Sequence, residues 1–384
     1  MTKKSDAPAI RFKGFSDAWE QRKVSDIFKV TRGYVLAATL TNDTKSDEMP
    51  YPVYSSQTKD FGLMGYYRDY LYENSITWTT DGANAGTVNY RAGKFYCTNV
   101  CGVLLSDKVN ASQMIAEALN NVAKGYVSYV GNPKLMNNVM SDIEIMIPVS
   151  PMEQKRISDY FATLDHLITL HQRKFEKLTN VKKSMLEKMF PQNGSSYPEI
   201  RFKGFTDPWE QRKFEEIAVR SSVICSDDTL PRVEYEDIVS GTGRLNKDIY
   251  AKQSSKSGIA FHQGDVLYGK LRPYLQNWLL PTFDGLAVGD FWVLQPQNAD
   301  SSFLYRLIQS RQFDEVANQS TGTKMPRADW KLVSKTVFSI PSNISEQAAI
   351  GTYFTALDSL ITLHQRKLET MQEIKKGLLQ QVFC

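Results

Sequence analysis

The sequence predicts an α+β protein that contains two tandem copies of one plan, each a body of short strands followed by a long helix. Two internal repeats support this prediction. Residues 8–23 match residues 198–213 at thirteen of sixteen positions, and residues 147–190 match residues 340–383 at half of 44 positions. Between the repeated blocks lie two bodies without convincing similarity, residues 24–146 and 214–339. Two copies imply pseudo-twofold symmetry, and divergent bodies imply that two different things are recognised.

The second repeated block has a heptad pattern in both copies. Its seam positions alternate spacings of four and three, a 3.5-residue period that predicts a long helix with a coiled-coil seam. Ser150 and Ser345 stand where the two helices would begin. The seam residues are Ile157, Phe161, Leu164, Ile168 and His171 in the first copy and Ile350, Phe354, Leu357, Ile361 and His364 in the second. Two helices with one seam pattern in one chain most simply pack on each other.

Polar residues interrupt this seam at equivalent places in the two copies. His171 corresponds to His364, and Lys182 corresponds to Lys375. Polar seam residues usually set the register of a coiled coil, and we favour that role over ligand binding.

The divergent bodies have short stretches rich in β-branched and aromatic residues, broken by Gly, Asn and Asp, which are typical of strands. Such stretches occur at residues 75–80, 88–90, 265–269 and 291–294, and helical patterns occur at 111–123 and 301–318. The chain therefore divides into five predicted parts: a first body at 1–149, a helix at 150–190, a polar linker at 191–198, a second body at 199–342 and a second helix at 343–384.

Length and composition bound the class of protein. The 384 residues suffice for two domains of about 150 residues each with connectors. Apolar residues make up 42% and charged residues 23%, which excludes a wholly disordered chain. The net charge of +4 permits nucleic acid as a partner without requiring it. The four cysteines form no disulfide framework, and neither a signal peptide nor a run of about 18 apolar residues occurs. We therefore expect a cytoplasmic protein without a membrane partner.

Motifs for catalysis and for metal binding are missing, so we predict no catalytic residue and no metal ligand. Three of the four histidines lie on the predicted long helices. Cys97 and Cys101 have neither a second cysteine pair nor a nearby histidine to complete a zinc site. No G-x-x-x-x-G-K-[ST] loop is present, and neither is the Asn/Asp-Pro-Pro-aromatic tetrapeptide of amino-methyltransferases.

Polar and basic loops are the remaining candidates for function, and they suit nucleic acid. Arg and Lys match guanine edges and phosphates, while Gln and Asn match adenine edges in the major groove. Each loop by itself is equally compatible with ordinary solvated surface. The predicted DNA-binding residues are Ser55, Ser56, Gln57, Thr80, Asn84, Lys134 and Asn137 in the first body and Lys270, Arg272, Tyr274, Gln276, Lys324 and Arg327 in the second.

These features together resemble the specificity subunit of type I restriction–modification enzymes, over the whole chain. The resemblance rests on the tandem plan and on a signature at the start of each long helix. In the first copy it reads Ile147-Pro148-x-x-x-x-Glu153-Gln154 followed by Leu164-Asp165, and in the second Ile340-Pro341-x-x-x-x-Glu346-Gln347 followed by Leu357-Asp358. Further similar phrases are Phe15-x-x-x-Trp19-Glu, Phe205-x-x-x-Trp209-Glu and Gly264-Asp265-Val-Leu-Tyr-Gly-Lys270-Leu-Arg272-Pro-Tyr274.

The resemblance implies two target-recognition domains separated by an antiparallel coiled coil of the two long helices. Each domain would read one half of a bipartite double-stranded DNA sequence, with the half-sites about 34 Å apart on one DNA face. Adenine methylation and ATP-driven cleavage would belong to two modification subunits and to restriction subunits. S-adenosylmethionine, ATP and Mg are accordingly expected on those partners, with no cofactor in this chain.

Three alternatives remain open at this point. The chain could be a coiled-coil scaffold or adaptor without DNA specificity, which the repeated helices predict equally well and the polar loops disfavour. A self-contained methyltransferase or nuclease would lack its motifs. The repeated opening segments could dock identical partners, although we favour a structural role with Phe12, Phe15 and Trp19 in the core. We also favour a solvated helix face over spacer DNA contact for the cations Arg173, Lys174, Lys177, Lys182, Lys183 and Lys188.

Overall fold

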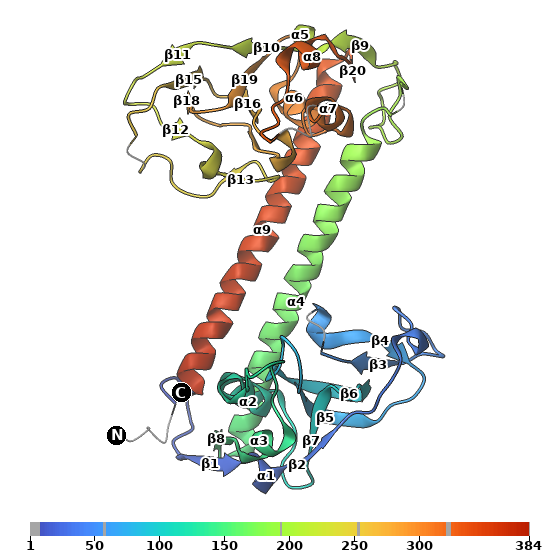
Figure 1. The fold of residues 1–384 in the computed structure, drawn as a ribbon, viewed down its shortest axis with the longest axis vertical. Helices are drawn as coiled ribbons and strands as arrows, with labels where there is room; N and C mark the ends of the chain where they lie inside the picture. The colour runs from blue at the N-terminus through green and yellow to red at the C-terminus, as the bar shows by residue number, and fades with distance from the viewer. Residues whose placement is uncertain (1–7, 57–58, 193, 252–253, 320–323, 384) are drawn as a thin grey trace. The chain divides into compact units, whose positions relative to one another are not determined.

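The computed structural model describes residues 8–56, 59–192, 194–251, 254–319 and 324–383. By its internal contacts the chain forms two compact units, each with one body and part of each long helix. Unit 1 comprises residues 1–172 and 366–384, and unit 2 comprises residues 173–365. Figure 1 shows the course of the chain and labels its elements.

Unit 1 contains a six-stranded sheet with helices packed against it. Its elements, in chain order, are β1 (Trp19–Lys23), α1 (Val24–Ile27), β2 (Lys29–Arg32), β3 (Tyr51–Tyr54), β4 (Leu63–Tyr67), β5 (Tyr72–Thr79), β6 (Val88–Cys97), β7 (Cys101–Leu105), α2 (Gln113–Ala123), α3 (Asn137–Asp142), β8 (Glu144–Pro148) and α4 (Pro151–Lys188). The sheet order is β2-β7-β5-β6-β3-β4, and β1 pairs with β8 in a separate ribbon. The strands β3 and β6 run parallel, and the other neighbouring pairs are antiparallel.

Unit 2 divides its strands among smaller sheets. Its elements are β9 (Glu210–Lys213), α5 (Phe214–Ile217), β10 (Ala218–Ser221), β11 (Ile224–Cys225), β12 (Arg232–Val233), β13 (Ile238–Val239), β14 (Arg244–Leu245), β15 (Gly258–Phe261), β16 (Val266–Gly269), β17 (Trp278–Leu279), β18 (Gly285–Ala287), β19 (Phe291–Pro296), α6 (Ser301–Leu307), α7 (Arg311–Ala317), α8 (Trp330–Lys335), β20 (Val337–Ile340) and α9 (Ile344–Val382). The sheet orders are β10-β19-β16-β17 and β11-β15-β18-β12, with ribbons β13-β14 and β20-β9.

The two bodies share a framework despite their divergent sequences. The antiparallel order β10-β19-β16 in unit 2 repeats the order β2-β7-β5 in unit 1, and the ribbon β20-β9 repeats β1-β8. The side chains at equivalent places differ. Trp78 lies over Gly102, where an added Cβ would come within 2.1 Å of the indole. The equivalent pair in unit 2 is Tyr268 stacked on Trp292, with ring centroids 5.5 Å apart. Backbone hydrogen bonds hold this framework, so its side chains can change.

The predicted short elements are confirmed, with two differences. The predicted helix at 301–318 is two helices, α6 and α7. The second begins because the Ser310 hydroxyl accepts a hydrogen bond from the Phe313 N–H at 3.3 Å. Ser150 caps α4, accepting from the Glu153 N–H at 3.4 Å. The expected cap at Ser345 is wrong, because the Asn343 side chain accepts from the Ser345 N–H at 2.8 Å and so stands at the start of α9.

In unit 1 a buried carboxylate ties the opening segment to the start of α4. Arg11 donates from Nε and Nη2 to the two oxygens of Glu153 at 2.6 and 2.7 Å. The Trp19 indole N–H donates to the same carboxylate at 3.4 Å. Glu153 is 0% exposed, so this clamp supplies its only charge partner among the residues described. The opening segment therefore has a structural role, with Trp19 buried and Phe12 and Phe15 half-buried.

Unit 2 repeats the clamp with the second copy of the same residues. Arg201 donates to both oxygens of Glu346 at 2.7 and 2.8 Å, and the Trp209 indole donates at 3.2 Å. Glu346 is buried like its counterpart. The strongest sequence identity between the two halves thus coincides with one repeated set of buried charge contacts.

Ion pairs join the long helices in unit 1. Lys375 of α9 contacts Asp165 of α4 at 2.7 Å and Glu117 of α2 at 2.6 Å. Gln113 donates to both carboxylates, at 3.0 Å to Asp165 and 2.8 Å to Glu117. Burial raises the pKa of Glu117. One ammonium therefore serves two carboxylates in a largely buried setting.

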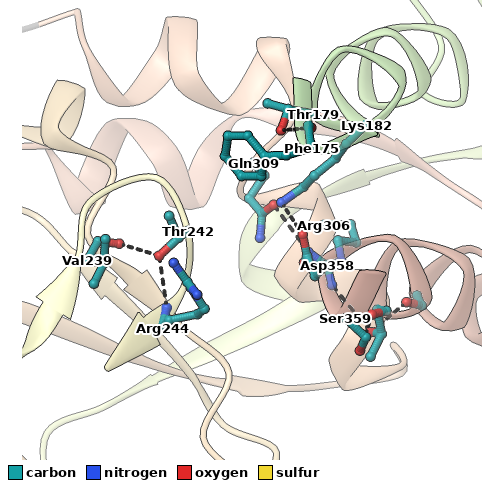
Figure 2. A network of polar contacts seen from close by, with 12 residues as sticks. Phe175, Thr179, Lys182, Val239, Thr242, Arg244, Arg306, Gln309, Asp358 and Ser359 are labelled. Carbon is teal, nitrogen blue, oxygen red and sulfur yellow. Dashed lines mark hydrogen bonds and ion pairs between the residues drawn. The ribbon is translucent and has the colours of Figure 1, made fainter. Parts of the chain in front are cut away.

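Unit 2 contains the matching pair with the third charge reversed. Lys182 of α4 contacts Asp358 of α9 at 2.6 Å, and Arg306 of α6 donates to the same carboxylate at 2.8 Å, as Figure 2 shows. Arg306 and Glu117 each lie in the helix that follows the middle strand of the shared framework. The Lys182 side chain is only 14% exposed, so its predicted place on a solvated face is wrong. Both seam lysines instead pair with the aspartate of the opposite helix, which fixes the register.

The predicted seam residues serve the bodies as well as the helix pair. Ile157 and Phe161 lie in the core of the first body, where the end of α9 also packs, and the Phe161 and Phe383 rings are 5.9 Å apart. Ile350, Phe354 and Leu357 lie in the core of the second body together with the end of α4. Leu164 and His171 are buried, while Ile168, Ile361 and His364 are half-buried.

We expect Lys375→Met to destabilise the protein by about 3–5 kcal/mol, because it leaves two buried carboxylates without a cation. Lys182→Met is the matched variant, and its loss should be smaller because Asp358 keeps Arg306. The pKa of Glu117 is raised in the folded state, so stability in the Lys375 variant should fall as pH rises from 5 to 8. Urea unfolding of both variants at the two pH values measures this. Equal losses, or a loss independent of pH, would contradict the assignment.

Replacing the clamp carboxylates should cost a similar amount of stability in each unit. Glu153→Gln and Glu346→Gln each remove the charge that pairs a mostly buried arginine, at about 3 kcal/mol. The exposed pair of Glu20 with Arg22 provides the control, and Glu20→Gln should change stability by less than about 0.5 kcal/mol. Tryptophan fluorescence during urea unfolding reports all three variants. If the two clamp variants unfold like the control, the clamps have no structural weight.

Candidate nucleic-acid interface

In unit 2, two of the predicted loops are joined by backbone bonds. The loop after β16 contains Lys270, and the loop before α8 contains Arg327. Leu271 and Arg327 form an isolated antiparallel bridge. Beside it the Ala328 N–H donates to the Lys270 carbonyl at 2.9 Å. Two cations that lie far apart in the sequence are therefore held next to each other.

The turn that follows, residues 272–276, presents three different side chains to solvent. Its two ends, Arg272 and Gln276, have left-handed backbone conformations with φ of 49° and 56°. Such conformations cost about 1 kcal/mol or more for a residue with a Cβ, so the surroundings must hold the turn. One holding contact is the Arg272 N–H donating to the Pro326 carbonyl at 2.8 Å. The side chains of Arg272, Tyr274 and Gln276 are exposed. A rigid turn thus offers a guanidinium, a ring and an amide.

Asp290, which the sequence did not single out, holds the two bridged cations. Its carboxylate lies 3.4 Å from the Lys270 Nζ and 3.2 Å from an Arg327 guanidinium nitrogen. Its backbone carbonyl accepts from the Tyr235 hydroxyl at 2.6 Å, and burial raises the pKa of this phenol. Asp290 precedes β19 directly, but only the folded chain shows that it faces the bridged loops. It offsets part of their positive charge and orients both side chains.

Unit 1 repeats the bridged loops with other side chains. Asp81 and Lys134 form the isolated bridge, and the Leu135 N–H donates to the Thr80 carbonyl at 2.8 Å. Thr80 and Lys134 thereby occupy the places of the two bridged cations of unit 2. Lys134 is half exposed and lies 3.8 Å from the Asp81 carboxylate. Unit 1 therefore presents one cation at the bridge where unit 2 presents two.

Other predicted residues of unit 1 hold their own loop. The Asn84 amide donates to the Ser56 carbonyl at 2.9 Å, and the Ser55 hydroxyl accepts from the Thr98 hydroxyl at 2.9 Å. These groups already have protein partners, which reduces their capacity to contact a base. Gln57 lies outside the described residues.

Two predicted residues lie close to the bridges without being part of them. Asn137 is half-buried at the start of α3. Lys324 is exposed in the segment that leads to Arg327. The prediction that all these residues bind DNA stays a prediction.

Neither cysteine chemistry nor a metal centre accompanies these loops. Cys97 and Cys101 are buried free thiols, and burial raises the pKa of Cys101 to about 11. Within the described ranges, no group of three or more His, Cys, Asp or Glu residues could hold a metal ion. No described helix combines the length and the apolar character that crossing a membrane requires.

Comparisons with known proteins agree on one family. The family model of the type I restriction modification DNA specificity domain matches residues 16–180. The putative type I specificity subunit S.MpnORF289P N-terminus of Mycoplasma pneumoniae is 37% identical over 148 residues, which cover 37% of this chain and 73% of that protein. A second relative from M. pneumoniae, the putative type I specificity subunit S.MpnORF285P, is 33% identical over 40% of this chain, and the match spans half of its own length.

A solved structure extends the likeness to the whole chain. The crystal structure of the type I restriction-modification system S subunit from M. genitalium superposes with a TM-score of 0.72. The match covers 98% of this chain and 99% of that one at 14% sequence identity. It confirms the predicted α+β fold with two bodies and paired long helices.

We expect Arg272→Ala to relax base preference at one position within one half of any selected DNA sequence. Losing a bidentate base contact costs about 1–3 kcal/mol, or roughly 5- to 150-fold in affinity. Selection from a pool of randomised duplexes measures the preference at every position of the bound sequence. Lys335→Ala is the control, since this exposed lysine of α8 pairs with Glu215. Unchanged preference in the Arg272 variant would make that side chain ordinary surface.

Proposed function

The chain belongs to the DNA specificity subunits of type I restriction–modification systems, and from this premise we propose that it recognises a bipartite double-stranded DNA sequence, one half with each body. The recurrence of the bridged loops supports this proposal most directly. Both bodies use the same backbone bonds around the bridge, but the side chains differ. A shared frame with different side chains suits two half-sites of different sequence.

The turn at residues 272–276 supplies the chemistry for reading base edges. A guanidinium can donate two hydrogen bonds to guanine O6 and N7, and an amide can pair with adenine N6 and N7. Because Arg272 and Gln276 are held in left-handed conformations, the turn loses little further entropy on binding. In unit 1, Lys134 is the cation best placed for the same task.

The chain contributes recognition and no catalysis. In this proposal two modification subunits methylate adenine with S-adenosylmethionine, and restriction subunits cleave DNA with ATP and Mg. Two identical partners require two equal surfaces. The repeated opening segments provide them, since Lys13 and Asp17 are exposed in the first copy and Lys203 and Asp207 are exposed in the second. The identical sequence at 167–174 and 360–367 provides another such pair.

The helix pair acts as the spacer between half-sites. Lys182 follows Asp165 by seventeen residues in α4, and Lys375 follows Asp358 by the same number in α9. Equal intervals let both cross-helix ion pairs form in one register. The distance between the two read sequences would then depend on helix length and not on base contacts.

Methylome sequencing tests the proposal. Cells that carry this gene with a cognate modification subunit should gain a methyladenine motif in two halves with a fixed gap. Exchanging residues 24–146 for the same span of a relative should change one half of the motif and leave the other half intact. A change in both halves would contradict one body per half-site. No new motif beside an active modification subunit would favour a scaffold without DNA specificity.

A further inference from the structure

A basic cavity of about 530 Å³ in unit 2 lies beside the bridged loops. Its lining includes the two bridged cations, Lys270 and Arg327, together with Arg220 of β10 and Lys331 of α8. The sequence pointed to neither Arg220 nor Lys331, because they stand outside the polar loops. The fold brings four cations from three segments to one hollow.

Tryptophan rings form a firm wall for this cavity. The Arg220 guanidinium lies over the Trp330 ring, 5.1 Å from its centroid. Trp330 in turn packs edge-on against Trp292, which is only 2% exposed, with ring centroids 5.2 Å apart. Stacking on a fixed ring holds the guanidinium without using its hydrogen-bond donors. Arg220 is therefore positioned and still able to bind an anion.

The charges around the cavity leave a positive excess. Asp290 pairs with Lys270 and Arg327. The carboxylate of Asp329 accepts from the Lys331 N–H at 2.8 Å at the start of α8. Among the described residues, no ion pair joins a carboxylate to Arg220 or to the Lys331 side chain, and both side chains are exposed. Two cations of four thus remain available to a bound anion.

We propose that this cavity seats one backbone phosphate of the DNA strand whose bases meet the turn at residues 272–276. The proposal rests on the function proposed above, because it takes duplex DNA as the ligand. Lys270 and Arg327 belong to the cavity and to the bridged loops alike, so DNA on those loops brings a phosphate to the hollow. A guanidinium with an ammonium suits phosphate oxygens, and such contacts fix register without reading sequence.

Unit 1 lacks this phosphate seat. Arg220 pairs with Leu294 in the sheet, and the same place in unit 1 holds Val30, which pairs with Leu104. Counting from the bridges, Asn138 stands where unit 2 has Lys331. The second body therefore anchors the DNA backbone more strongly than the first, while both bodies read bases.

The salt dependence of DNA binding tests the seat. For the full chain with its modification subunits, the slope of log K against log salt should fall by about 0.9 in Arg220→Gln/Lys331→Gln, the value for one lost phosphate contact. Across a fourfold change in salt this amounts to roughly a threefold difference in affinity. Base preference in randomised-duplex selection should stay the same. Arg220→Lys should keep most of the slope, and Lys335→Gln on the same helix should keep all of it.

Neutral methylphosphonate linkages locate the phosphate. One position in the duplex should weaken wild-type binding and cause no further loss in the double variant. An unchanged slope, or losses that add at every position, would overturn the seat while wild-type sequence preference still supports the proposed function. If the wild type shows no sequence preference, the proposed function itself fails.

Discussion

The buried glutamate at the start of each long helix is the constraint on which the rest of the structure depends. A carboxylate without water needs a charged partner and hydrogen bonds, and Glu153 obtains them from Arg11 and Trp19. Meeting that need draws the opening segment across the helix start and places β1 beside β8. The second copy repeats every contact. The near identity of the opening segments therefore has a sufficient cause inside the fold.

The helix pair keeps one register while its surroundings change sign. Each unit contains a lysine of one helix paired with an aspartate of the other. The neighbouring helix of the body adds Glu117 in unit 1 and Arg306 in unit 2. The lysine–aspartate pair tolerates either charge beside it, provided that no ion is left without a partner. This tolerance allows bodies of different sequence to attach to equivalent helices.

Recognition and framework are separated within each body. Backbone hydrogen bonds fix the three-strand order and the loop bridge, and they place few demands on side-chain identity. The places occupied by Thr80 and Lys134 in one body are Lys270 and Arg327 in the other. A fixed frame with free side chains explains how one plan supports two specificities. It also lets the second body add a phosphate seat that the first does not have.

The sequence by itself determined the duplicated plan, the α+β class and the two long helices, because repeats and a 3.5-residue period are local properties of the chain. It also singled out the turn around Arg272, through its run of cations, amides and aromatic rings. Only the tertiary structure decided which loops meet, that Asp290 holds two cations and that Asn84 holds its own loop. It likewise brought Arg220 and Lys331 to one cavity. Such contacts depend on the packing of distant segments, which leaves no periodic trace in the order of residues.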